Sequence, residues 1–267
     1  MPEDGVLDLN EMIGSNISSK WENLILKGDT YKNYSTLIVV ATRGTTKVSG
    51  HCPECKASVE LKHWVGLHPW VVESWKRFVK PMNVPITEMI ISGYEVGEAY
   101  NLAIDQFLNN EQLKNFKYIL FLEDDIIVPF MPNSFGPLIQ LYQRMADYDV
   151  ASGLYWTKGE PPLPLIYGNG DIDSVVPFEV NLNWKPGDVV EVNGCGMGFA
   201  LMKRSLFENP KLEKPFFKTV NEMSSGGSML MTQDLYFYQK IKKLGYKICV
   251  DTGIKCGHLD MNTEKIY

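Results

Sequence analysis

The sequence has few cysteines for its length, no long apolar run and no excess of basic residues. Five cysteines in 267 residues is an odd number, which is typical of reduced thiols rather than of a disulfide framework. No stretch reaches the roughly 18 apolar residues that a membrane-spanning helix needs. The opening MPEDGVLDLN is acidic and lacks the apolar segment of a signal peptide. We therefore expect a cytoplasmic protein with no membrane partner.

The charge balance limits the partners further. The formal net charge is −6, with 26 lysines and arginines against 32 aspartates and glutamates. Binding along a nucleic-acid backbone needs clustered cations, so this balance argues against broad non-specific binding and leaves open only a local basic groove. A hydrophobic content of 45% and a charged content of 22% are those of an ordinary globular protein with a substantial core.

Apolar runs and amphipathic segments alternate along most of the chain. The runs that read as strands cover residues 35–42, 89–94, 118–122, 149–156 and part of 247–259. The segments that read as helices cover residues 67–79, 95–110, 135–148 and 232–246, the last with Gly245 as its C-terminal cap. Residues 157–187 are rich in Gly, Pro and Asn and read as a loop region. The alternation predicts a single α/β domain with a mainly parallel sheet over residues 34–267, preceded by an arm or peripheral helix over residues 1–33.

Three adjacent acids follow a run of large apolar residues in YILFLEDDIIVPF. Glu123, Asp124 and Asp125 stand at the carboxyl end of a predicted buried strand, where open parallel sheets bind their ligands. Adjacent carboxylates repel one another and are costly to desolvate unless a positive charge is present. Oxygen ligands suit Mg²⁺ or Mn²⁺, either of which would bridge a pyrophosphate. The alternative is a solvated acidic turn that caps the next element.

The segment YILFLEDDIIVP resembles the metal-binding DxD strand of GT-A fold glycosyltransferases, family 2-like members in particular. On that pattern Glu123 takes the first Asp position, Asp124 the middle and Asp125 the second Asp. The resemblance implies a Rossmann-like GT-A sheet flanked by helices, a nucleotide-diphospho-sugar donor, and a Mn²⁺ or Mg²⁺ ion. It implies that Asp125 is a metal ligand, that Glu123 is a further candidate, and that Asp124 lies beside the donor.

Two segments upstream of the acids are similar to the same template. STLIVVATRGTT resembles the first GT-A strand, whose terminal loop holds the nucleotide and here carries Thr42, Arg43 and Gly44. GEAYNLAI resembles the helix near the base and diphosphate, which usually reads R-N-x-A. Tyr100 stands in place of the arginine, and Asn101 keeps the pattern as a donor-binding residue.

Two segments downstream complete the resemblance. NGCGMGFALMKRSLF resembles the glycine segment beside the donor sugar and assigns Gly196 a donor contact; tight packing is the alternative explanation of its glycines. TQDLYFYQKIKKLGYKICVDTGIKCGHL resembles the common ending in which an acidic pair precedes a late histidine. Asp234 falls on the acid that deprotonates the acceptor in inverting members, with Gln233 in place of its Glu neighbour. His258 falls on the metal-ligating histidine, which suits Mn²⁺ better than Mg²⁺. Taken singly, Asp234 is also explained by the helix dipole and His258 as a tail residue.

A cysteine pair lies outside this template. HCPECKASVELKHWVGLH contains Cys52 and Cys55 in a CPxC turn, followed by His63 and His68. CPxC is a common zinc-knuckle turn and the histidine spacing is an allowed one, but the gap between the pairs is shorter than in a zinc finger. Two interpretations remain open, a small structural zinc site and a polar loop with free thiols.

Three functions are consistent with the sequence. The leading hypothesis is a metal-dependent glycosyltransferase that acts on an acceptor hydroxyl. By analogy with small phage enzymes, that acceptor would be a hydroxymethylated base in DNA, and the compartment the host cytoplasm. The alternatives are a nucleotidyltransferase with the same metal-diphosphate site, and a non-catalytic GT-A-like binding module. Four aromatic residues are candidates for stacking on sugar or base, namely Tyr155, Trp156, Tyr167 and Trp184.

Overall fold

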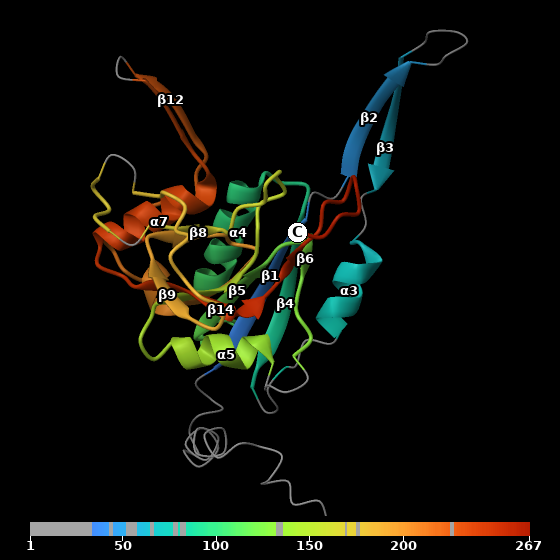
Figure 1. The fold of residues 1–267 in the computed structure, drawn as a ribbon. Coiled ribbons are helices and arrows are strands. Elements are labelled where there is room, and N and C mark those ends of the chain that lie inside the picture. The colour runs from blue at the N-terminus through green and yellow to red at the C-terminus, as the bar shows by residue number, and fades with distance from the viewer. Residues whose placement is uncertain are drawn as a thin grey trace, which may run out of the picture.

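A seven-stranded sheet runs through the middle of the molecule (Figure 1). The computed structural model describes residues 34–42, 45–51, 58–64, 67–76, 80, 84–131, 136–168, 170–174, 177–224 and 227–267, of which 45–51, 58–64, 222–224 and 227–230 are described by backbone alone. The strand order is β4-β1-β5-β11-β7-β14-β9. The bounds are β4 Ile86–Ser92, β1 Thr36–Thr42, β5 Tyr118–Leu122, β11 Phe199–Lys203, β7 Val150–Leu154, β14 Ile248–Lys255 and β9 Val189–Val192.

Most of these strands share one direction. β1 is parallel to both β4 and β5, and β14 is parallel to β7. β11 is antiparallel to β5 and β7, and β9 is antiparallel to β14. The predicted fold class is confirmed: a mainly parallel sheet flanked by helices in one domain, as in the Rossmann-like GT-A architecture. The carboxyl ends of β4, β1 and β5 consequently meet at one edge of the sheet.

Helices cover both faces of the sheet because its strands bury side chains on alternate sides. Leu37 and Val39 of β1 pack into one core cluster, and Ile38 and Val40 pack into the other. The first cluster is covered by α4 Val96–Asn109, α6 Arg204–Phe207 and α7 Gln233–Lys243. The second is covered by α5 Pro137–Arg144 and receives Trp75 of α3 Pro69–Lys76. None of the described helices is long and apolar enough to cross a membrane.

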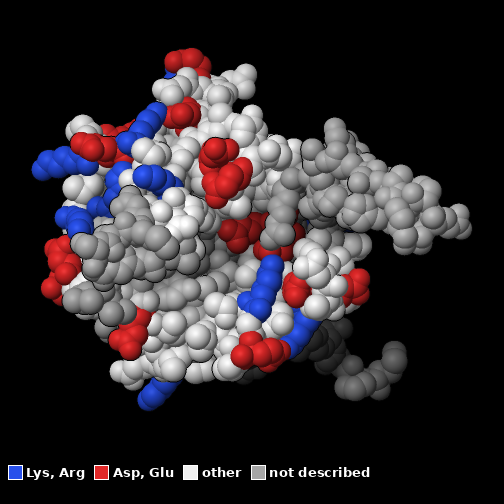
Figure 2. Space-filling model, turned by 90° about the horizontal axis from the view of Figure 1, so that it is seen from above, with Lys and Arg blue, Asp and Glu red and all other residues white. Residues whose placement is uncertain are grey.

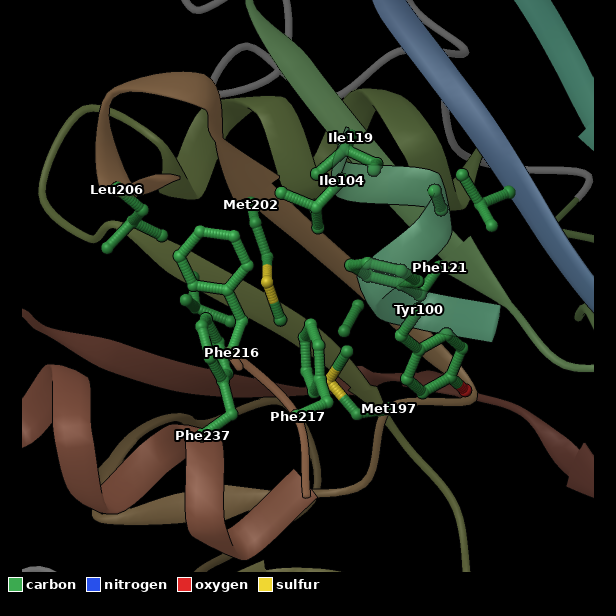
Figure 3. Close-up of a cluster of buried hydrophobic side chains, with 14 of the residues drawn as sticks. Tyr100, Ile104, Ile119, Phe121, Met197, Met202, Leu206, Phe216, Phe217 and Phe237 are labelled. Atoms are coloured by element: carbon green, nitrogen blue, oxygen red, sulfur yellow. The ribbon is translucent and has the colours of Figure 1, made fainter. Parts of the chain in front are cut away.

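Aromatic side chains in the first cluster join three elements that border the sheet edge (Figure 3). The ring of Tyr100 from α4 lies 4.6 Å from that of Phe121 in β5 and 5.2 Å from that of Phe217. Phe217 in turn stacks at 4.5 Å on Phe237 of α7. Large buried aromatic rings contribute much of the packing energy of a core, so this chain of contacts fixes the N-terminal ends of α4 and α7 relative to β5.

Four further strand pairs lie outside the central sheet. Two hairpins project from the end where the central strands have their carboxyl ends (Figure 1), β2 Thr45–His51 with β3 Ser58–Trp64 and β12 Val220–Ser224 with β13 Gly227–Met231. Neither was predicted, because their sequences lack the long apolar and β-branched run by which the central strands are recognised. Two short pairs also form, β6 Ile126–Ile127 with β15 Gly257–His258 and β8 Ile166–Tyr167 with β10 Gly194–Cys195. The predicted arm over residues 1–33 lies outside the described residues.

The two helices nearest the sheet edge end in different ways. Gly245 has φ +84° and its amide bonds to Lys242 O at 2.9 Å, which confirms the predicted glycine cap of α7. At the end of α4, the buried guanidinium of Arg204 donates to Phe107 O at 2.8 Å, Leu108 O at 3.1 Å and Leu113 O at 3.0 Å. These include terminal helix carbonyls that have no partner within the helix.

We expect Arg204→Met to lower the free energy of unfolding by about 3 kcal/mol, because it leaves three buried carbonyls without their donor. Urea denaturation followed by circular dichroism measures this change. Lys114→Met is the control, since Lys114 makes only an exposed ion pair with Glu111, and its effect should stay within about 0.5 kcal/mol. Equal losses in the two variants would show that Arg204 does not cap α4.

Candidate functional site

A cleft opens at the carboxyl ends of β4, β1 and β5. Its volume is about 190 Å³, and it is lined by Ala41, Thr42, Tyr94, Val96, Glu123, Asp124, Asp125 and Gln233. Seen from the side of the projecting hairpins, acidic side chains lie in a hollow near the middle of this face (Figure 2). The three predicted acids therefore border a cleft, as the position of their strand indicated.

Asp125 is the most enclosed of the three acids, with 8% of the residue exposed. Its Oδ1 atom is buried and has no hydrogen-bond partner among the described residues. Its Oδ2 atom forms an ion pair with the Lys158 ammonium and lies 3.6 Å from Nε2 of His258. A buried carboxylate oxygen without a partner costs free energy, so this oxygen is available to bind a cation.

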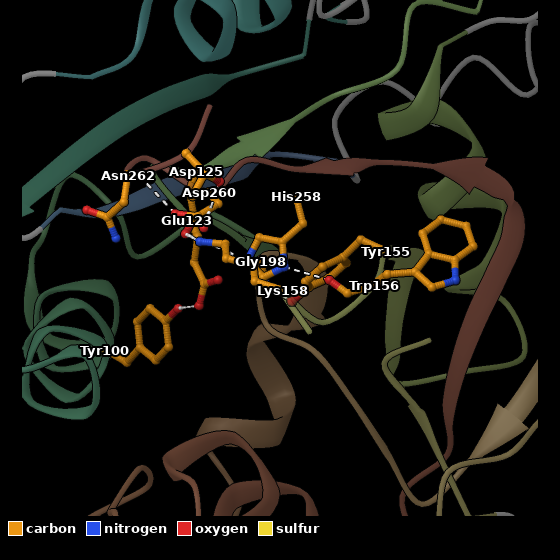
Figure 4. Close-up of polar contacts among 11 residues, drawn as sticks. Tyr100, Glu123, Asp125, Tyr155, Trp156, Lys158, Gly198, His258, Asp260 and Asn262 are labelled. Atoms are coloured by element: carbon orange, nitrogen blue, oxygen red, sulfur yellow. Dashed lines mark hydrogen bonds and ion pairs between the residues drawn. The ribbon is translucent and has the colours of Figure 1, made fainter. Parts of the chain in front are cut away.

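His258 reaches Asp125 through strand pairing. β15 runs antiparallel to β6, with His258 opposite Ile126, and Leu259 N donates to Asp125 O at 2.8 Å. On the other side of the ring, Nδ1 lies 2.6 Å from Trp156 O (Figure 4). A carbonyl oxygen can only accept, so Nδ1 carries a proton, and Nε2 is the ring nitrogen that faces Asp125. A carboxylate oxygen and a ring nitrogen that face each other require a cation or a proton between them.

The surroundings keep Asp125 ionised. Burial by itself would raise the pKa of its carboxyl, but the His258 ring and the Lys158 ammonium outweigh burial and hold the pKa below its ordinary value. The side chain is therefore an anion at neutral pH, as a metal ligand must be.

The donor set fits a divalent cation that also takes ligands from a substrate. No group of three or more His, Cys, Asp or Glu side chains within the described ranges is close enough to hold a metal by itself. The separation of 3.6 Å between Asp125 Oδ2 and His258 Nε2 is wider than the ~3.0 Å between neighbouring octahedral ligands at about 2.1 Å from an ion, so a small side-chain shift would bring both atoms to one ion. Ions of this class are commonly held by one or two protein groups together with substrate phosphates. The unpartnered Oδ1 and the carbonyl-anchored histidine also match such a site.

Glu123 is engaged elsewhere. Its Oε1 accepts a hydrogen bond from the Tyr100 hydroxyl at 2.6 Å (Figure 4). Burial, the charge of Asp125 and, to a lesser extent, that of Asp234 raise the pKa of Glu123 to about 7, while Tyr100 opposes the shift. In the GT-A resemblance, Tyr100 stands where an arginine is usual, and Glu123 stands at the first Asp position. These two departures from the pattern are thus hydrogen-bonded to each other. The predicted metal role of Glu123 stays a prediction.

Asp234 lies in the first turn of α7, beside the cleft residue Gln233. Its carboxylate accepts hydrogen bonds from the Thr232 hydroxyl and from Leu235 N, the latter at 3.0 Å. Burial raises the pKa of Asp234, and its charge is close enough to raise that of Glu123. A carboxylate with a raised pKa is a stronger base, which is the property a general base needs.

The remaining donor-site predictions have different outcomes. Thr42 and Asp124 line the cleft, whereas Arg43 and Gly44 lie outside the described residues. Asn101 uses its amide within the protein, donating to Gly97 O at 2.8 Å and Phe217 O at 2.7 Å. Its Oδ1 accepts from the amides of residues 216 and 217, so Asn101 ties this loop to α4. Its contact with a donor stays a prediction.

Packing accounts for the glycine at position 196. A Cβ atom there would stand 2.0 Å from the Tyr155 hydroxyl, which also accepts from Gly198 N at 2.6 Å. The tight-packing interpretation therefore applies to Gly196, and its donor contact stays a prediction. The same packing leaves Tyr155 only 3% exposed, so the prediction of this ring as a stacking face was wrong.

The zinc hypothesis falls mainly on residues outside the described part of the chain. Cys52 and Cys55 are not described, and His63 is described by its backbone alone in β3. His68 lies at the start of α3, where its Nδ1 accepts from Trp70 N at 3.3 Å. Its ring meets that of Trp70 edge to face at 5.0 Å. The zinc site stays a prediction.

Two residues at the site were not predicted from the sequence. Tyr94 follows the end of β4, lines the cleft and is 55% exposed. Lys158 follows the end of β7 by a few residues and pairs with Asp125. Both stand after the carboxyl end of a strand, so the rule that singled out the acids would also have found these two residues.

Comparisons with known proteins support the fold. No family model matches the sequence, and a search of curated proteins found no match. Among solved structures, the chain is similar to A197 from STIV, with a TM-score of 0.50, 19% identity, and coverage of 87% of this chain and 92% of that one. It is also similar to GalNAc-T7 with UDP, GalNAc and Mn²⁺, with a TM-score of 0.45 and 12% identity. That match covers 85% of this chain but only 44% of GalNAc-T7. At this identity the likeness to A197 shows the fold alone.

We expect Glu123→Gln to become progressively more stable than the native protein between pH 4.5 and pH 7. The folded protein keeps a proton on Glu123 up to about pH 7, while the unfolded chain loses it near pH 4.5, so this group lowers stability as the pH rises through that window. The glutamine, which can still accept from Tyr100, removes this cost, and the gain should reach about 2 kcal/mol above pH 7. Urea titrations in EDTA across the window measure it. Glu111 is exposed, so the free energy of unfolding of Glu111→Gln should follow that of the native protein at every pH. If Glu123→Gln also followed the native protein across this window, the prediction would be contradicted.

We expect Gly196→Ala to destabilise the protein by about 2–3 kcal/mol, because the new methyl group overlaps the buried Tyr155 hydroxyl. Gly170→Ala is the matched control, since no atom lies within 4 Å of a Cβ there, and it should change stability by less than about 0.5 kcal/mol. Thermal melts of the two variants test the difference. A fully stable Gly196→Ala would show that position 196 tolerates a side chain.

Proposed function

We propose that this protein is a metal-dependent glycosyltransferase that moves a sugar from a nucleotide-diphospho-sugar to an acceptor hydroxyl. The observation that carries the proposal is the facing pair of Asp125 Oδ2 and His258 Nε2, 3.6 Å apart at the edge of a cleft. A carboxylate oxygen and an imidazole nitrogen held toward one point, by the turn after β5 and by β15, would serve as two ligands of one cation. Its place at the carboxyl end of β5 in a mainly parallel sheet is where such a fold binds its ligand.

Asp125 and His258 would hold the divalent cation, and Trp156 O would keep the imidazole in the correct tautomer. When bound, the cation supplies electrostatic stabilisation of the leaving diphosphate. The imidazole favours Mn²⁺ over Mg²⁺, because nitrogen is a poorer ligand for the harder ion. Asp124 lines the same cleft and would lie beside the donor.

The donor and the acceptor would meet other residues of the cleft. Thr42 stands where the nucleotide is expected, and the exposed ring of Tyr94 offers a stacking face for the base. Asn101 would act as a positioning residue that holds the loop at 216 and 217 against α4. Asp234 would take the proton of the acceptor hydroxyl, for which its raised pKa is suited. A hydroxymethylated base in DNA is the first acceptor to assay.

We expect Asp125→Asn to abolish Mn²⁺-dependent nucleotide binding, because the amide removes the anionic ligand. Asp234→Asn should leave nucleotide binding within about threefold and lower transfer by at least about 100-fold, because it removes only the base. Calorimetry with UDP, GDP and TDP, followed by mass spectrometry of acceptors incubated with the matching sugar donors, measures both effects. Asp173→Asn, a surface acid paired with Lys243, is the control and should change neither.

The same assays separate the alternatives. Release of pyrophosphate from a nucleoside triphosphate, with no transfer from any sugar donor, would identify a nucleotidyltransferase. Nucleotide binding without turnover would identify a binding module. Absence of both Mn²⁺-dependent binding and transfer would overturn the proposal.

A further inference from the structure

Lys158 is held in place by its own loop. In the hairpin that follows β7, Thr157 N donates to Leu163 O at 2.8 Å, and Leu163 N donates to the Thr157 hydroxyl at 3.0 Å. Glu160 at the tip forms an ion pair with Lys265 in the C-terminal segment. The backbone of Lys158 is therefore fixed above the acids even when its side chain moves.

The Lys158 ammonium uses the same carboxylate oxygen that faces the histidine. Nζ pairs with Asp125 Oδ2, the atom that lies 3.6 Å from His258 Nε2 (Figure 4). The Lys158 side chain is 25% exposed and that of Asp125 is 11% exposed, so water screens this pair only in part. The Lys158 ammonium is thus the positive charge that neutralises Asp125 in this structure.

We propose, on the basis of the function proposed above, that Lys158 and the divalent cation compete for Asp125 Oδ2. A divalent ion bound to Oδ2 would stand a few ångström from an ammonium that shares this oxygen, and like charges at that distance repel strongly in a partly buried site. Metal binding therefore displaces Lys158 from the acid. Lys158 acts as a built-in counter-ion that keeps the site neutralised until the metal arrives.

The displaced ammonium has a nearby partner. Asp260 is an exposed acid whose carboxylate accepts from Asn262 N and from the Thr263 hydroxyl, each at 2.9 Å. These hydrogen bonds, with a smaller contribution from the charge of Lys158, hold the pKa of Asp260 below its ordinary value. Asp260 therefore stays an anion within electrostatic reach of Lys158. The phosphates of a donor in the cleft would offer the ammonium a second anion.

This competition predicts that the metal alone binds weakly and that the donor strengthens metal binding. The free ion must break the ion pair of Lys158 with Asp125 before it gains its own ligand. A bound diphosphate supplies both oxygen ligands for the ion and a new partner for the lysine. Metal and donor affinity should consequently depend on each other by the same factor.

We expect Lys158→Met to bind Mn²⁺ about tenfold more tightly than the native protein, with no nucleotide present. The free Mn²⁺ signal in electron paramagnetic resonance, titrated against each protein, gives the dissociation constants. Lys203→Met is the matched control, because Lys203 forms an ion pair with Asp149 at 3.0 Å, far from the cleft. The side chains of Lys203 and Asp149 are 27% and 24% exposed, so this pair is also partly buried. It should leave Mn²⁺ affinity unchanged, and adding Asp125→Asn to Lys158→Met should abolish the gain.

The outcomes distinguish the competition from the proposed function. A measurable but equal affinity in the native protein and in Lys158→Met overturns the competition and leaves metal-dependent transfer standing. Weaker binding by Lys158→Met overturns the competition as well, since it makes the lysine a helper of the metal. Binding of Mn²⁺ by Lys158→Met, with none by the native protein, supports the competition most strongly. No binding by either protein overturns the competition, whereas the metal site falls only if Mn²⁺-dependent nucleotide binding is also absent. Circular dichroism melts establish that every variant is folded.

Discussion

The site depends on one constraint, that a buried carboxylate oxygen and an imidazole nitrogen which face each other need a cation or a proton between them. Asp125 and His258 satisfy this description because Trp156 O accepts a hydrogen bond from Nδ1, which leaves Nε2 facing the acid. In the protein alone, the ammonium of Lys158 supplies the charge. In the proposed enzyme, a divalent ion would supply it and would carry the diphosphate with it. The proposed chemistry of the site would follow from this exchange of one cation for another.

The fold assembles the site from segments that are far apart in the sequence. Pairing of β15 with β6 places His258 beside the acids, and the loop after β7 delivers Lys158. On the opposite face of the sheet edge, the aromatic contacts of Tyr100, Phe217 and Phe237 fix α4 and α7. Rigid elements on both sides keep the cleft in shape, which is what preorganised electrostatic stabilisation requires.

Glu123 and Tyr100 show how two departures from a pattern explain each other. Taken alone, each residue departs from the GT-A pattern. Glu123 is one carbon longer than Asp, and Tyr100 has a phenol in place of a guanidinium. In the structure they form one buried hydrogen bond of 2.6 Å. The pair holds a carboxyl group whose pKa is about 7 directly beside Asp125, so its charge responds to pH and to any cation bound nearby.

The sequence by itself determined the mainly parallel sheet, the core helices and the position of the acids at a strand end. Those features are local, because apolar periodicity and a strand boundary can be read over a few residues. Only the tertiary structure decided that Lys158 neutralises Asp125, that Tyr100 binds Glu123, and that Gly196 makes room for Tyr155. It also revealed two projecting hairpins, each of which pairs neighbouring segments of the chain. The three side-chain contacts join residues distant in sequence, so their charges and packing are set by the fold.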